Sequence, residues 1–571
     1  MSKILRTELL LPDYPKNLAT MLDSNTRLYG NHPIYQEVQN DRYDPLSWNQ
    51  FKDDISVIQQ NLKNRGLAKG NRVAILSPNR KEMLEIELAI MSMGAIAVPI
   101  FAGYTANWAD TLVKFCEPQF VVVADSKQLA KISSPESYGA IIHFEPIEQT
   151  KLNNFIHYSE LLSSANDSNE IQGATIPHDT VCLMMFTSGT MGKPKCVQLT
   201  HGNILSQQAA MRTLWKLSHQ DRFLSYLPWH HSFGGIFEKY AAITNGAVLS
   251  LEHGYGKHVN IILENWKKVR PTVFFSVPRI YQEIASLIQQ DREIEKLIFH
   301  DELRFIFTAA APLPQNISDI FLEHNIPVIE GWGLTETSPC CTVTDPKVSR
   351  NSGVVGKPIP GVTLKLADDG EILVKGPNVM RGYFKNPETT KKVLSKNGWF
   401  STGDIGEYTP AGLRLISRKD RIFKLSNAKK VVPTKIENLV VKDCAYLAHA
   451  YVTGKNHDYP VALLFPNKSM FSKALEESKQ KIGCDCPNSI GDLADCLKRC
   501  LKKSNDLMDF KYYRIKSAML IDYELSIENE ELTPSMKLAP NVVGDVFEAN
   551  IEHLYDDKKP LPEKVYVIHL G

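Results

Sequence analysis

The chain has 571 residues and a formal net charge of +1, and its shares of apolar and charged residues are ordinary for a globular protein. This length is too great for one compact core and predicts roughly three or four packing units. The near-neutral charge gives no electrostatic basis for nucleic acid as the main partner.

The apolar segments are too short to cross a bilayer, which requires about 20 consecutive apolar residues. The longest candidate, residues 88–101, is interrupted by Gly94 and Pro99 and predicts a buried helix followed by a buried strand. The N-terminal apolar run is too short for a signal peptide and soon meets Asp13 and Pro15. We therefore expect a cytoplasmic protein.

The ten cysteines are expected to be reduced in that compartment. One group is clustered in the sequence and consists of Cys484, Cys486, Cys496 and Cys500. A four-thiolate zinc site is one interpretation, because the last two cysteines would share a helix face. The spacing is not a common one and no histidine lies nearby, so chance clustering stays open as the other interpretation.

Helical and strand patterns alternate through residues 45–135. The expected helices are 51–66 and 81–95, and the expected strands are 71–78, 97–101 and 120–125. Short apolar strands separated by helices predict a parallel α/β sheet. The same rhythm resumes with a strand at 180–186, after a polar, irregular stretch at 148–178 that we interpret as a link within one large domain.

The pattern changes after about residue 352. Residues 361–377 contain two short strands around an Asp-Asp-Gly turn, and 412–420 contains another strand, which predicts a smaller antiparallel region. From about residue 421 a C-terminal region follows, with strands at 461–466 and 517–523 around helices.

The strand at 180–186 runs into a loop that reads TSGTMGKPK (187–195). Backbone N–H groups near Gly189 and Gly192 are suited to phosphate oxygens. The loop's hydroxyl and ammonium groups belong to Thr187, Ser188, Thr190, Lys193 and Lys195. The glycine spacing does not fit a Walker A loop. Alone, such a loop is most often a mobile connection.

A second motif, EGWGLTETSP (330–339), places an aromatic residue between glycines. Trp332, between Gly331 and Gly333, is suited to stacking on a purine. The Thr335 hydroxyl and the Glu336 carboxylate are oxygen ligands of the kind that Mg²⁺ prefers. The alternative is a turn with a buried tryptophan.

Two further motifs are weak by themselves. In the first, Asp404 follows a Ser-Thr-Gly turn and is suited to accepting ribose hydroxyls, while Arg418 offers a fork of donors to ribose or phosphate. In the second, ELTPSMKLAP (531–540), Lys537 lies between two prolines. Singly, each would be interpreted as a surface turn or a solvated charge.

Together, in this order, the four motifs resemble the adenylate-forming superfamily of acyl-CoA synthetases, firefly luciferase and peptide-synthetase adenylation domains. The resemblance extends from about residue 15 to about Tyr555. The first motif resembles T-S-G-T-T-G-x-P-K-G-V, and the third resembles S-T-G-D with G-R-x-x-D. The fourth resembles the L-T-P-T-x-K loop of long-chain acyl-CoA synthetases.

The resemblance implies a role for each matching position. It implies that residues 187–195 bind triphosphate, that Ala309, Ala310, Ala311 and Pro312 line the adenine site, and that Trp332 stacks on adenine with Gly331 and Gly333 beside it. It further implies phosphate and Mg²⁺ binding by Thr335 and Glu336, an acyl-pocket role for His231, ribose binding by Asp404, and ribose or phosphate contact by Arg418. Asp420 would be the hinge, and Lys537 would bridge the substrate carboxylate and the α-phosphate.

The sequence departs from the family pattern in several places. Four residues stand where the family pattern has glycine: Cys196, Ala309, Ala310 and Ser417. Trp332 replaces the usual tyrosine. None of these changes removes a charged contact, although the alanines are expected to crowd the adenine site. The adjacent His230 and His231 would point to opposite faces of a strand, which argues against a shared metal.

The implied fold is α/β: a large N-terminal domain of parallel α/β sheets with a small β-barrel-like subdomain, hinged to a smaller α+β C-terminal domain. We expect domains at 1–417 and 421–571, with the hinge at 418–420. The implied chemistry uses ATP, Mg²⁺ and coenzyme A. A carboxylate first becomes an acyl-adenylate, and after domain rotation the CoA thiol attacks it, which gives acyl-CoA and AMP.

The motifs favour a medium- or long-chain fatty acid as the substrate. The stretch LPWHHSFGG (227–235) also resembles synthetases of aromatic acids such as ferulate. Two other hypotheses remain: a fatty acyl-AMP ligase that loads a carrier protein, and a non-catalytic ATP-binding protein. The basic stretch 511–516 predicts contact with CoA phosphates or with anionic lipid at a peripheral membrane surface, or else is an exposed face without a ligand.

Overall fold

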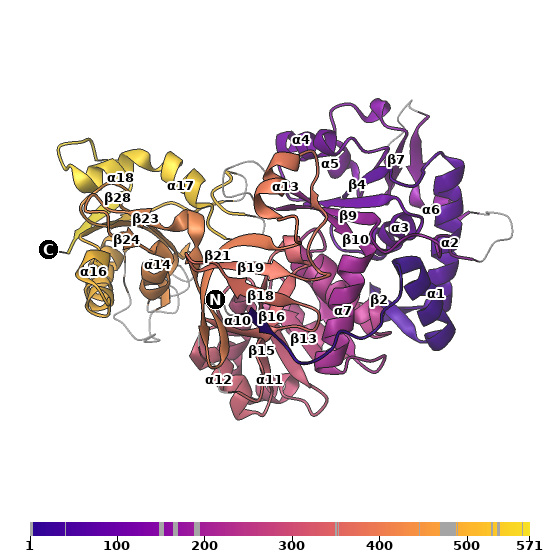
Figure 1. Ribbon diagram of the computed structural model, residues 1–571, viewed down its shortest axis with the longest axis horizontal. Helices are drawn as coiled ribbons and strands as arrows, with labels where there is room; N and C mark the ends of the chain where they lie inside the picture. Colours follow the sequence, from indigo (N-terminus) through magenta and orange to yellow (C-terminus); the bar gives the residue numbers. More distant parts are fainter. Residues whose placement is uncertain are drawn as a thin grey trace.

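The computed structural model describes residues 4–570 apart from 40, 148–152, 164–169, 188–194, 349–350, 352, 443, 445, 469–486, 488, 527–528, 534–536 and 562. Within these ranges a large N-terminal domain with two extended sheets joins a smaller C-terminal domain with a third sheet (Figure 1). In the described residues, no helix has both the length and the apolarity that membrane crossing requires. The predicted fold class is confirmed.

The first sheet is the one predicted from the alternating helices and strands. Its order is β20-β10-β9-β5-β4-β6-β7-β8, and β4 to β8 and β9 are parallel. The strands are β4 (Arg72–Leu76), β5 (Ile96–Ile100), β6 (Phe120–Val123), β7 (Ala140–His143), β8 (Phe155–His157), β9 (Val181–Thr187), β10 (Lys195–Thr200) and β20 (Gly382–Tyr383). The stretch interpreted as irregular therefore contributes β8 and the short helix α6 (Tyr158–Leu162).

The second sheet combines a parallel half with an antiparallel half. Its order is β1-β18-β19-β21-β22-β17-β16-β15-β14-β13-β11-β12-β2-β3. The parallel half contains β2 (Pro33–Gln39), β11 (Arg222–Ser225), β12 (Val248–Leu251), β13 (Val273–Ser276), β14 (Phe305–Thr308) and β15 (Val328–Gly333), with β3 (Arg42–Ser47) antiparallel at its edge. The antiparallel half contains β1 (Ile4–Arg6), β16 (Cys340–Val343), β17 (Val354–Pro358), β18 (Thr363–Leu366), β19 (Glu371–Lys375), β21 (Phe400–Thr409) and β22 (Gly412–Arg418). The predicted antiparallel region is thus continuous with the parallel sheet through β15 and β16.

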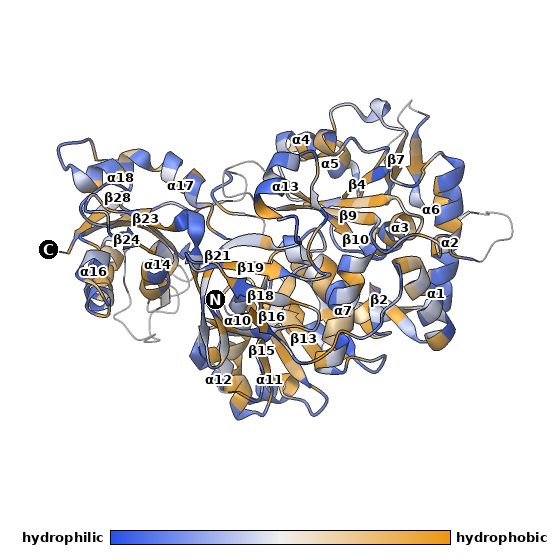
Figure 2. Cartoon of the chain, viewed as in Figure 1, coloured by the Kyte–Doolittle hydropathy of each residue, from blue (hydrophilic) through white to orange (hydrophobic). Residues whose placement is uncertain are grey.

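Helices cover both sheets of the large domain, and several begin at strong capping residues. Ser47 and Gln50 form a capping box at the start of α2, and Thr200 and Asn203 form one at the start of α7, directly after β10. The helices are α1 (Leu18–Tyr29), α2 (Trp48–Asn64), α3 (Lys81–Ser92), α4 (Ala106–Cys116), α5 (Ser126–Leu129), α7 (His201–Trp215), α8 (Lys239–Thr244), α9 (Val259–Val269), α10 (Pro278–Ile288), α11 (Arg292–Ile298), α12 (Gln315–Glu323) and α13 (Pro387–Val393). Figure 2 shows apolar strands inside and hydrophilic outer faces on the helices.

The C-terminal domain has its own core. Its sheet has the order β25-β26-β27-β28, with the hairpin β23–β24 beside it, and two apolar clusters lie wholly beyond residue 421. The elements are β23 (Phe423–Lys424), β24 (Lys430–Val431), α14 (Pro433–Lys442), β25 (Leu447–Thr453), β26 (Val461–Pro466), α16 (Ile490–Asp506), β27 (Ser517–Ile521), α17 (Pro540–Val546), α18 (Glu548–Tyr555) and β28 (Val565–His569).

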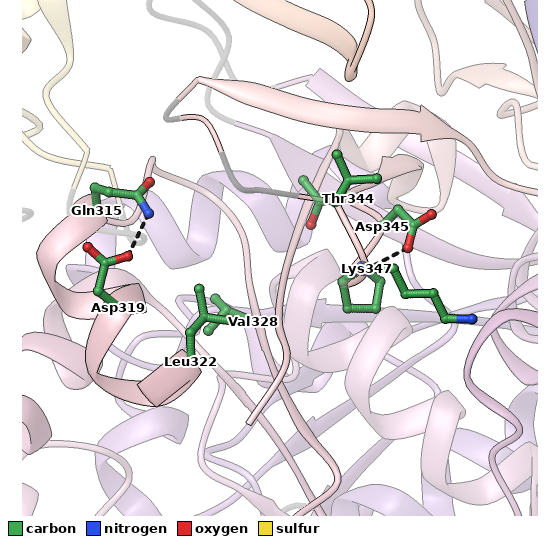
Figure 3. Close-up of a pocket in the computed structure, with 9 residues that line it drawn as sticks. Gln315, Asp319, Leu322, Val328, Thr344, Asp345 and Lys347 are labelled. Atoms are coloured by element: carbon green, nitrogen blue, oxygen red, sulfur yellow. Dashed lines mark hydrogen bonds between the residues drawn. The ribbon is translucent and has the colours of Figure 1, made fainter. Parts of the chain in front are cut away.

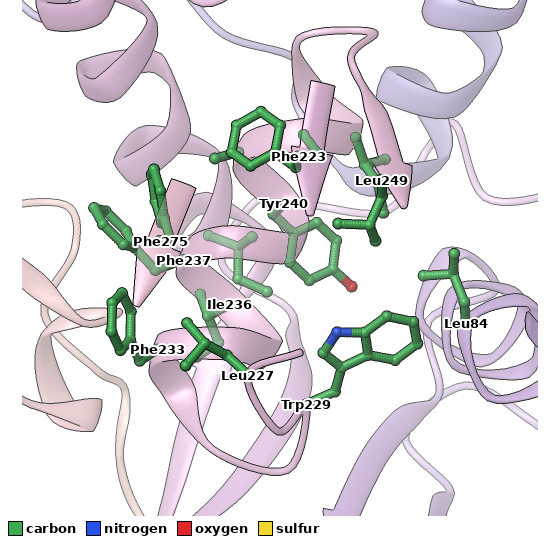
Figure 4. Close-up of a cluster of buried hydrophobic side chains, with 14 of the residues drawn as sticks. Leu84, Phe223, Leu227, Trp229, Phe233, Ile236, Phe237, Tyr240, Leu249 and Phe275 are labelled. Carbon is green, nitrogen blue, oxygen red and sulfur yellow. The ribbon is translucent and has the colours of Figure 1, made fainter. Parts of the chain in front are cut away.

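A buried ion pair joins the helices of the two large-domain sheets. Lys239 Nζ of α8 donates to Glu87 Oε1 of α3 at 2.6 Å, and Tyr240 Oη donates to the same oxygen at 3.2 Å. Lys239 is fully buried and lies 5.1 Å from the centre of the Trp229 ring. The surrounding apolar cluster includes Trp229, Tyr240 and Leu84 (Figure 4). The pair therefore fixes how the two sheets sit against each other.

We expect Lys239→Met to lower the free energy of unfolding by about 3–5 kcal/mol, because it leaves the Glu87 carboxylate buried without a counter-charge. Urea denaturation followed by circular dichroism measures the loss. The double variant Glu87→Leu/Lys239→Met removes both charges and should recover most of it. A Lys239→Met protein as stable as wild type would contradict this role for the pair.

Candidate functional site

Three parallel strands of the second sheet end at one edge, and each leads into a predicted site segment. β11 is followed by residues 227–235, β14 is followed by 309–312, and β15 itself ends in Gly331–Gly333. Because carboxyl ends of parallel strands share an edge, the fold brings these three segments together. They are therefore neighbours although they are far apart in the sequence.

Asp404 lies at the centre of the site, opposite Arg418 in the register of β21 and β22. Its Oδ2 accepts from Trp332 Nε1 at 2.9 Å, and its Oδ1 accepts from Arg418 Nη1 at 3.1 Å. Burial raises the pKa of Asp404, and Arg418 and Trp332 act against that rise. An ionised carboxylate has about four acceptor positions, and Trp332 and Arg418 use two of them, which is compatible with the predicted contact to ribose hydroxyls. The structure thus joins residues from two separate motifs.

Glu336 and Thr335 lie in a short 3₁₀ turn after β15. Glu336 is buried and its Oε1 accepts from Tyr383 Oη at 2.8 Å. Thr335 Oγ1 lies 3.0 Å from Ser232 Oγ, which follows the His230-His231 pair. Tyr383 could not be predicted from the sequence, because an isolated tyrosine near a glycine carries no chemical signal. The structure shows that it holds the predicted Mg²⁺ ligand in place.

The predicted phosphate loop is flanked by a pair of strands. Thr187 at the end of β9 is paired with Lys195 at the start of β10, and Lys195 Nζ lies 5.3 Å from the centre of the Tyr383 ring. The base of the loop is therefore close to the Tyr383–Glu336 contact. The predicted residues Ser188, Gly189, Thr190, Gly192 and Lys193 lie outside the described residues, so their phosphate role stays a prediction.

The segment after β14 is exposed and strained at one position. Ala310 has a φ of 77°, a left-handed conformation that costs a non-glycine residue about 1–2 kcal/mol. Ala310, Ala311 and Pro312 are exposed, which leaves their backbone open to a ligand. In β15, Gly333 is required by close packing, because a Cβ there would lie 1.7 Å from the Pro339 carbonyl oxygen.

The two histidines are held neutral by burial. Burial lowers the pKa of His230 to about 3, and burial together with the charge of Lys537 lowers that of His231 to about 4. His230 packs against Phe101, with ring centres 4.5 Å apart, and His231 Nδ1 accepts from the Phe233 N–H at 3.3 Å. Neutral imidazoles are compatible with an apolar substrate beside them.

The chain passes from one domain to the other within residues 418–421. Arg418 Nε lies 3.6 Å from Asp420 Oδ1, and Arg418 Nη1 is bonded to Asp404 of the large domain. Lys419 pairs with Asp369 at 2.6 Å, which also belongs to the large domain, whereas Arg421 pairs with Glu437 of the C-terminal domain. Asp420 therefore separates residues held by different domains.

Lys537 reaches the large domain from the C-terminal domain. Its surface is exposed to solvent, but the surrounding protein desolvates the ammonium group and thereby lowers its pKa. The Asp404 carboxylate acts to raise this pKa, and the Arg418 guanidinium acts to lower it. The lysine's own charge in turn helps to lower the pKa of His231. Its loop is closed by a bond from the Thr533 N–H to the Lys537 carbonyl at 2.8 Å. Lys537 thus lies where the Asp404 carboxylate acts on its pKa and where its own charge acts on the pKa of His231.

The donor set fits one hard cation at Glu336. A buried carboxylate beside the Thr335 hydroxyl offers the oxygen ligands that Mg²⁺ takes together with substrate phosphates. A second group, His300 with Asp301 and Glu302, has potential ligand atoms near one another, but Arg270 already pairs with both acids at 2.8 and 2.9 Å. We assign no metal to it.

Two other features take no part in this site. A pocket of about 220 Å³ between α12 and the segment after β16 is lined by Gln315, Asp319, Leu322, Val328 and residues 344–348 (Figure 3). Of the clustered cysteines, Cys484 and Cys486 lie outside the described residues, and Cys496 and Cys500 lie on α16. Within the described residues these two belong to no group of three potential metal ligands, and the zinc interpretation stays untested.

Comparison with known proteins gives two family matches along the chain. The model of a family described as AMP-binding enzyme matches residues 22–384, and that of the AMP-binding enzyme C-terminal domain matches residues 420–559. Long chain acyl-CoA synthetase 7, peroxisomal, of Arabidopsis thaliana is 27% identical over 92% of this chain and 84% of its own length. Long-chain-fatty-acid–CoA ligase 6 of Homo sapiens is 28% identical over 85% and 78%.

Solved structures share the fold. O-succinylbenzoate coenzyme A synthetase (MenE) from Bacillus subtilis, in complex with AMP, aligns with a TM-score of 0.72 at 22% identity, covering 93% of this chain and 98% of that one. ATP-bound MatB from Rhodopseudomonas palustris aligns with a TM-score of 0.74 at 22% identity, covering 93% and 99%.

We expect the free energy of unfolding to fall as the pH drops from about 6.5 towards 4. Histidines with lowered folded-state pKa values bind protons more readily in the unfolded chain, so their stabilising effect is complete above pH 6.5 and is lost below it. His230→Asn should reduce the slope by up to about 1.4 kcal/mol per pH unit. Urea titrations at pH 7, 6 and 5 measure the slope, and an unchanged slope in the variant would contradict the assignment.

Proposed function

Because the chain belongs to the AMP-binding enzyme family, we propose that it is an acid–CoA ligase that activates a long-chain fatty acid. The reaction consumes ATP and CoA and releases AMP and pyrophosphate. Support for the substrate class comes from relatives named as long-chain acyl-CoA synthetases and ligases, which align with most of the chain. The C-terminal LTPSMK sequence points to the same class.

One observation carries the proposal. Lys537 extends from the C-terminal domain to the large domain, where it interacts with the Asp404 carboxylate and its charge helps to lower the pKa of His231. A lysine in this position would stabilise the negative charge that develops when a nucleotide reacts with a second substrate. A surface lysine far from the site would have no such effect on the pKa of a buried histidine.

The first step is an in-line displacement at phosphorus. A carboxylate oxygen of the fatty acid forms a bond to the α-phosphorus of ATP, the bond to the bridging oxygen breaks, and pyrophosphate leaves with the electron pair. The products are the acyl-adenylate and pyrophosphate, with no oxidation or reduction. Because negative charge spreads over phosphate oxygens, catalysis is mainly positioning and electrostatic stabilisation.

Each residue then has a task in that step. Asp404 holds the ribose, Trp332 and residues 309–312 receive the adenine, and Thr335 and residues 187–195 receive the phosphates. Glu336, positioned by Tyr383, would hold Mg²⁺, which when bound neutralises phosphate charge. Lys537 places its ammonium group between the carboxylate and the α-phosphate.

The second step requires the C-terminal domain to turn. We infer domains at 1–417 and 421–571 with Asp420 as the pivot, supported by the change of ion-pair partners between Lys419 and Arg421. Rotation withdraws Lys537 and opens access for CoA. The thiolate of CoA attacks the acyl carbonyl carbon, the bond to AMP breaks, and AMP leaves with the electron pair.

A substrate panel tests the function directly. The protein is incubated with ATP, Mg²⁺ and palmitate, octanoate or ferulate, with and without CoA, and pyrophosphate and thioester are measured. The proposal expects pyrophosphate with palmitate and palmitoyl-CoA only when CoA is present. Ferulate as the preferred acid would indicate an aryl-acid ligase. Adenylate without CoA thioester would indicate an acyl-AMP ligase that loads a carrier protein, and no product would indicate a non-catalytic protein.

Lys537→Ala should lower the rate of acyl-adenylate formation by about 10²–10³-fold, the usual cost of removing one preorganised electrostatic group. The rate of thioester formation from supplied acyl-adenylate and CoA should stay near wild type, because Lys537 is withdrawn in that step. Lys455→Ala, at an exposed lysine of the same domain, is the control for loss of one positive charge. Undiminished adenylate formation in Lys537→Ala would contradict the mechanism.

We further propose a cytoplasmic location. None of the eight cysteines among the described residues forms a disulfide bond, which fits a reducing compartment. Cell fractionation with antibody detection should place the protein in the cytosolic fraction. Recovery with peroxisomes, the location in the name of the Arabidopsis relative, would overturn the location without affecting the catalytic proposal.

A further inference from the structure

A hydrogen bond connects the two domains far from the hinge. Trp108 Nε1 of α4, in the large domain, donates to Glu530 Oε1, in the C-terminal domain between β27 and α17. Figure 1 shows α17 on the side of the C-terminal domain that faces the large domain. A second contact between the domains lies at the hinge itself, where Thr434 Oγ1 donates to Ser417 Oγ at 3.1 Å. A hydrogen bond beside the pivot is hardly stretched when the domain rotates. A hydrogen bond far from the pivot is broken by a small rotation and therefore opposes it more strongly.

Glu530 precedes Lys537 in the connection between β27 and α17, and hydrogen bonds tie the described residues of this connection together. Glu531 accepts from Tyr523 Oη at 2.8 Å and from the Ser526 N–H at 3.0 Å. The Ala539 N–H donates to the Glu531 carbonyl at 2.8 Å, so the chain on the far side of Lys537 is tied to the residue after Glu530. We therefore expect a shift of Glu530 to move Lys537 as well.

The large-domain side of the contact leads to the active site. Tyr104, just before α4, packs edge-on against Phe101, with ring centres 5.3 Å apart. Phe101 in turn packs against His230, beside the histidine that responds to the charge of Lys537. The carboxylate of Glu530 also acts on Tyr104, whose pKa burial raises to about 12. Both partners of the Trp108–Glu530 bond are thus linked to groups at the site.

The backbone at Glu530 is unusual for its residue type. Its φ of 63° is a left-handed conformation that favours glycine and costs other residues free energy. A glutamate at this position gives up local stability, and the only contribution of its side chain that the described residues reveal is the contact with α4. This indicates that the side chain has a role between the domains.

We propose that Trp108 and Glu530 form an interdomain latch that positions Lys537 for adenylate formation and must open before CoA reacts. Glu530 is a positioning residue, because it acts through the loop of Lys537 and touches no substrate. The inference rests on the proposed function. The Trp108–Glu530 contact and the hinge would then together determine which half-reaction the domain orientation allows.

The test compares the two half-reactions in Trp108→Phe, Glu530→Gln and Glu530→Gly. Adenylate formation is followed by single-turnover pyrophosphate release, and thioester formation is followed from isolated palmitoyl-adenylate and CoA. Trp108→Phe and Glu530→Gly should each slow adenylate formation about three- to tenfold, the range of one net hydrogen bond, with the KM for ATP unchanged. Glu530→Gln keeps an acceptor oxygen and should lose less. Thioester formation should be unchanged or faster.

Glu530→Gly separates a positioning role from a structural one. Since glycine suits the left-handed backbone, this variant should be at least as stable as wild type in urea, while its adenylate formation is slower. Glu524→Gly and Glu524→Gln, in an exposed glutamate of the same segment, are matched controls that should leave adenylate formation unaltered. The double variant Trp108→Phe/Glu530→Gly should be no slower than either single variant.

Several results would overturn the latch: wild-type adenylate formation in Glu530→Gly, equal slowing of both half-reactions, or additive losses in the double variant. Limited trypsin cleavage at Lys419 and Arg421 gives a measurement that needs no activity. Faster cleavage at the hinge in Trp108→Phe and Glu530→Gly supports the latch, and unchanged cleavage overturns it. If wild type forms no adenylate with any acid, the proposed function fails, and the cleavage rates still decide on the latch.

Discussion

Asp404 accepts hydrogen bonds from Trp332 on one carboxylate oxygen and from Arg418 on the other, and it does so from a buried position. These contacts tie the end of a parallel strand, β15, to two antiparallel strands, β21 and β22, and β22 ends where the chain leaves the large domain. The residue proposed to bind ribose is therefore bonded to Arg418, the last residue of β22 and two positions before the proposed pivot, Asp420. A ribose bound at the two further acceptor positions of Asp404 would share this carboxylate with Arg418, so nucleotide binding and domain orientation would be linked through one side chain.

The sheet topology explains why motifs so far apart in the sequence converge. Parallel strands deliver their following loops to one edge, so β11, β14 and β15 place the histidine pair, the alanine segment and Trp332 together. The antiparallel strands continue from that same sheet and bring Asp404 to the indole of Trp332. The buried Glu87–Lys239 pair then fixes the second parallel sheet against the first, which supplies Thr187, Lys195 and Tyr383. The site depends on both sheets and on how they are joined.

Much of the fold could be predicted from the sequence because the signals were local. Apolar runs bounded by glycine and proline marked the strands at β4, β5, β6 and β9, and the Asp-Asp-Gly turn marked the pair β18–β19. Resemblance supplied site residues in the same way, since each lies in a short motif. What escaped prediction are contacts between distant residues of ordinary type. Tyr383 and Glu336 are 47 positions apart, Lys239 and Glu87 are 152 apart, and Trp108 and Glu530 are 422 apart. No periodicity or spacing in one sequence links such pairs, because only the folded chain brings them into contact.

A two-step enzyme with a mobile domain faces a constraint on how strongly its first arrangement is held. If the domain contact were large and apolar, Lys537 would stay in place and the second step would be slow; if there were none, the lysine would spend little time where it is required. An exposed hydrogen bond to a carboxylate, with a modest net free energy, meets both requirements, because water can replace it when the domain turns. The strained backbone at Glu530 works in the same direction, since it limits how much net stability the contact adds. In the proposed arrangement, one weak contact at the rim and the ion pairs at the hinge hold the C-terminal domain, so that neither step imposes a large barrier on the other.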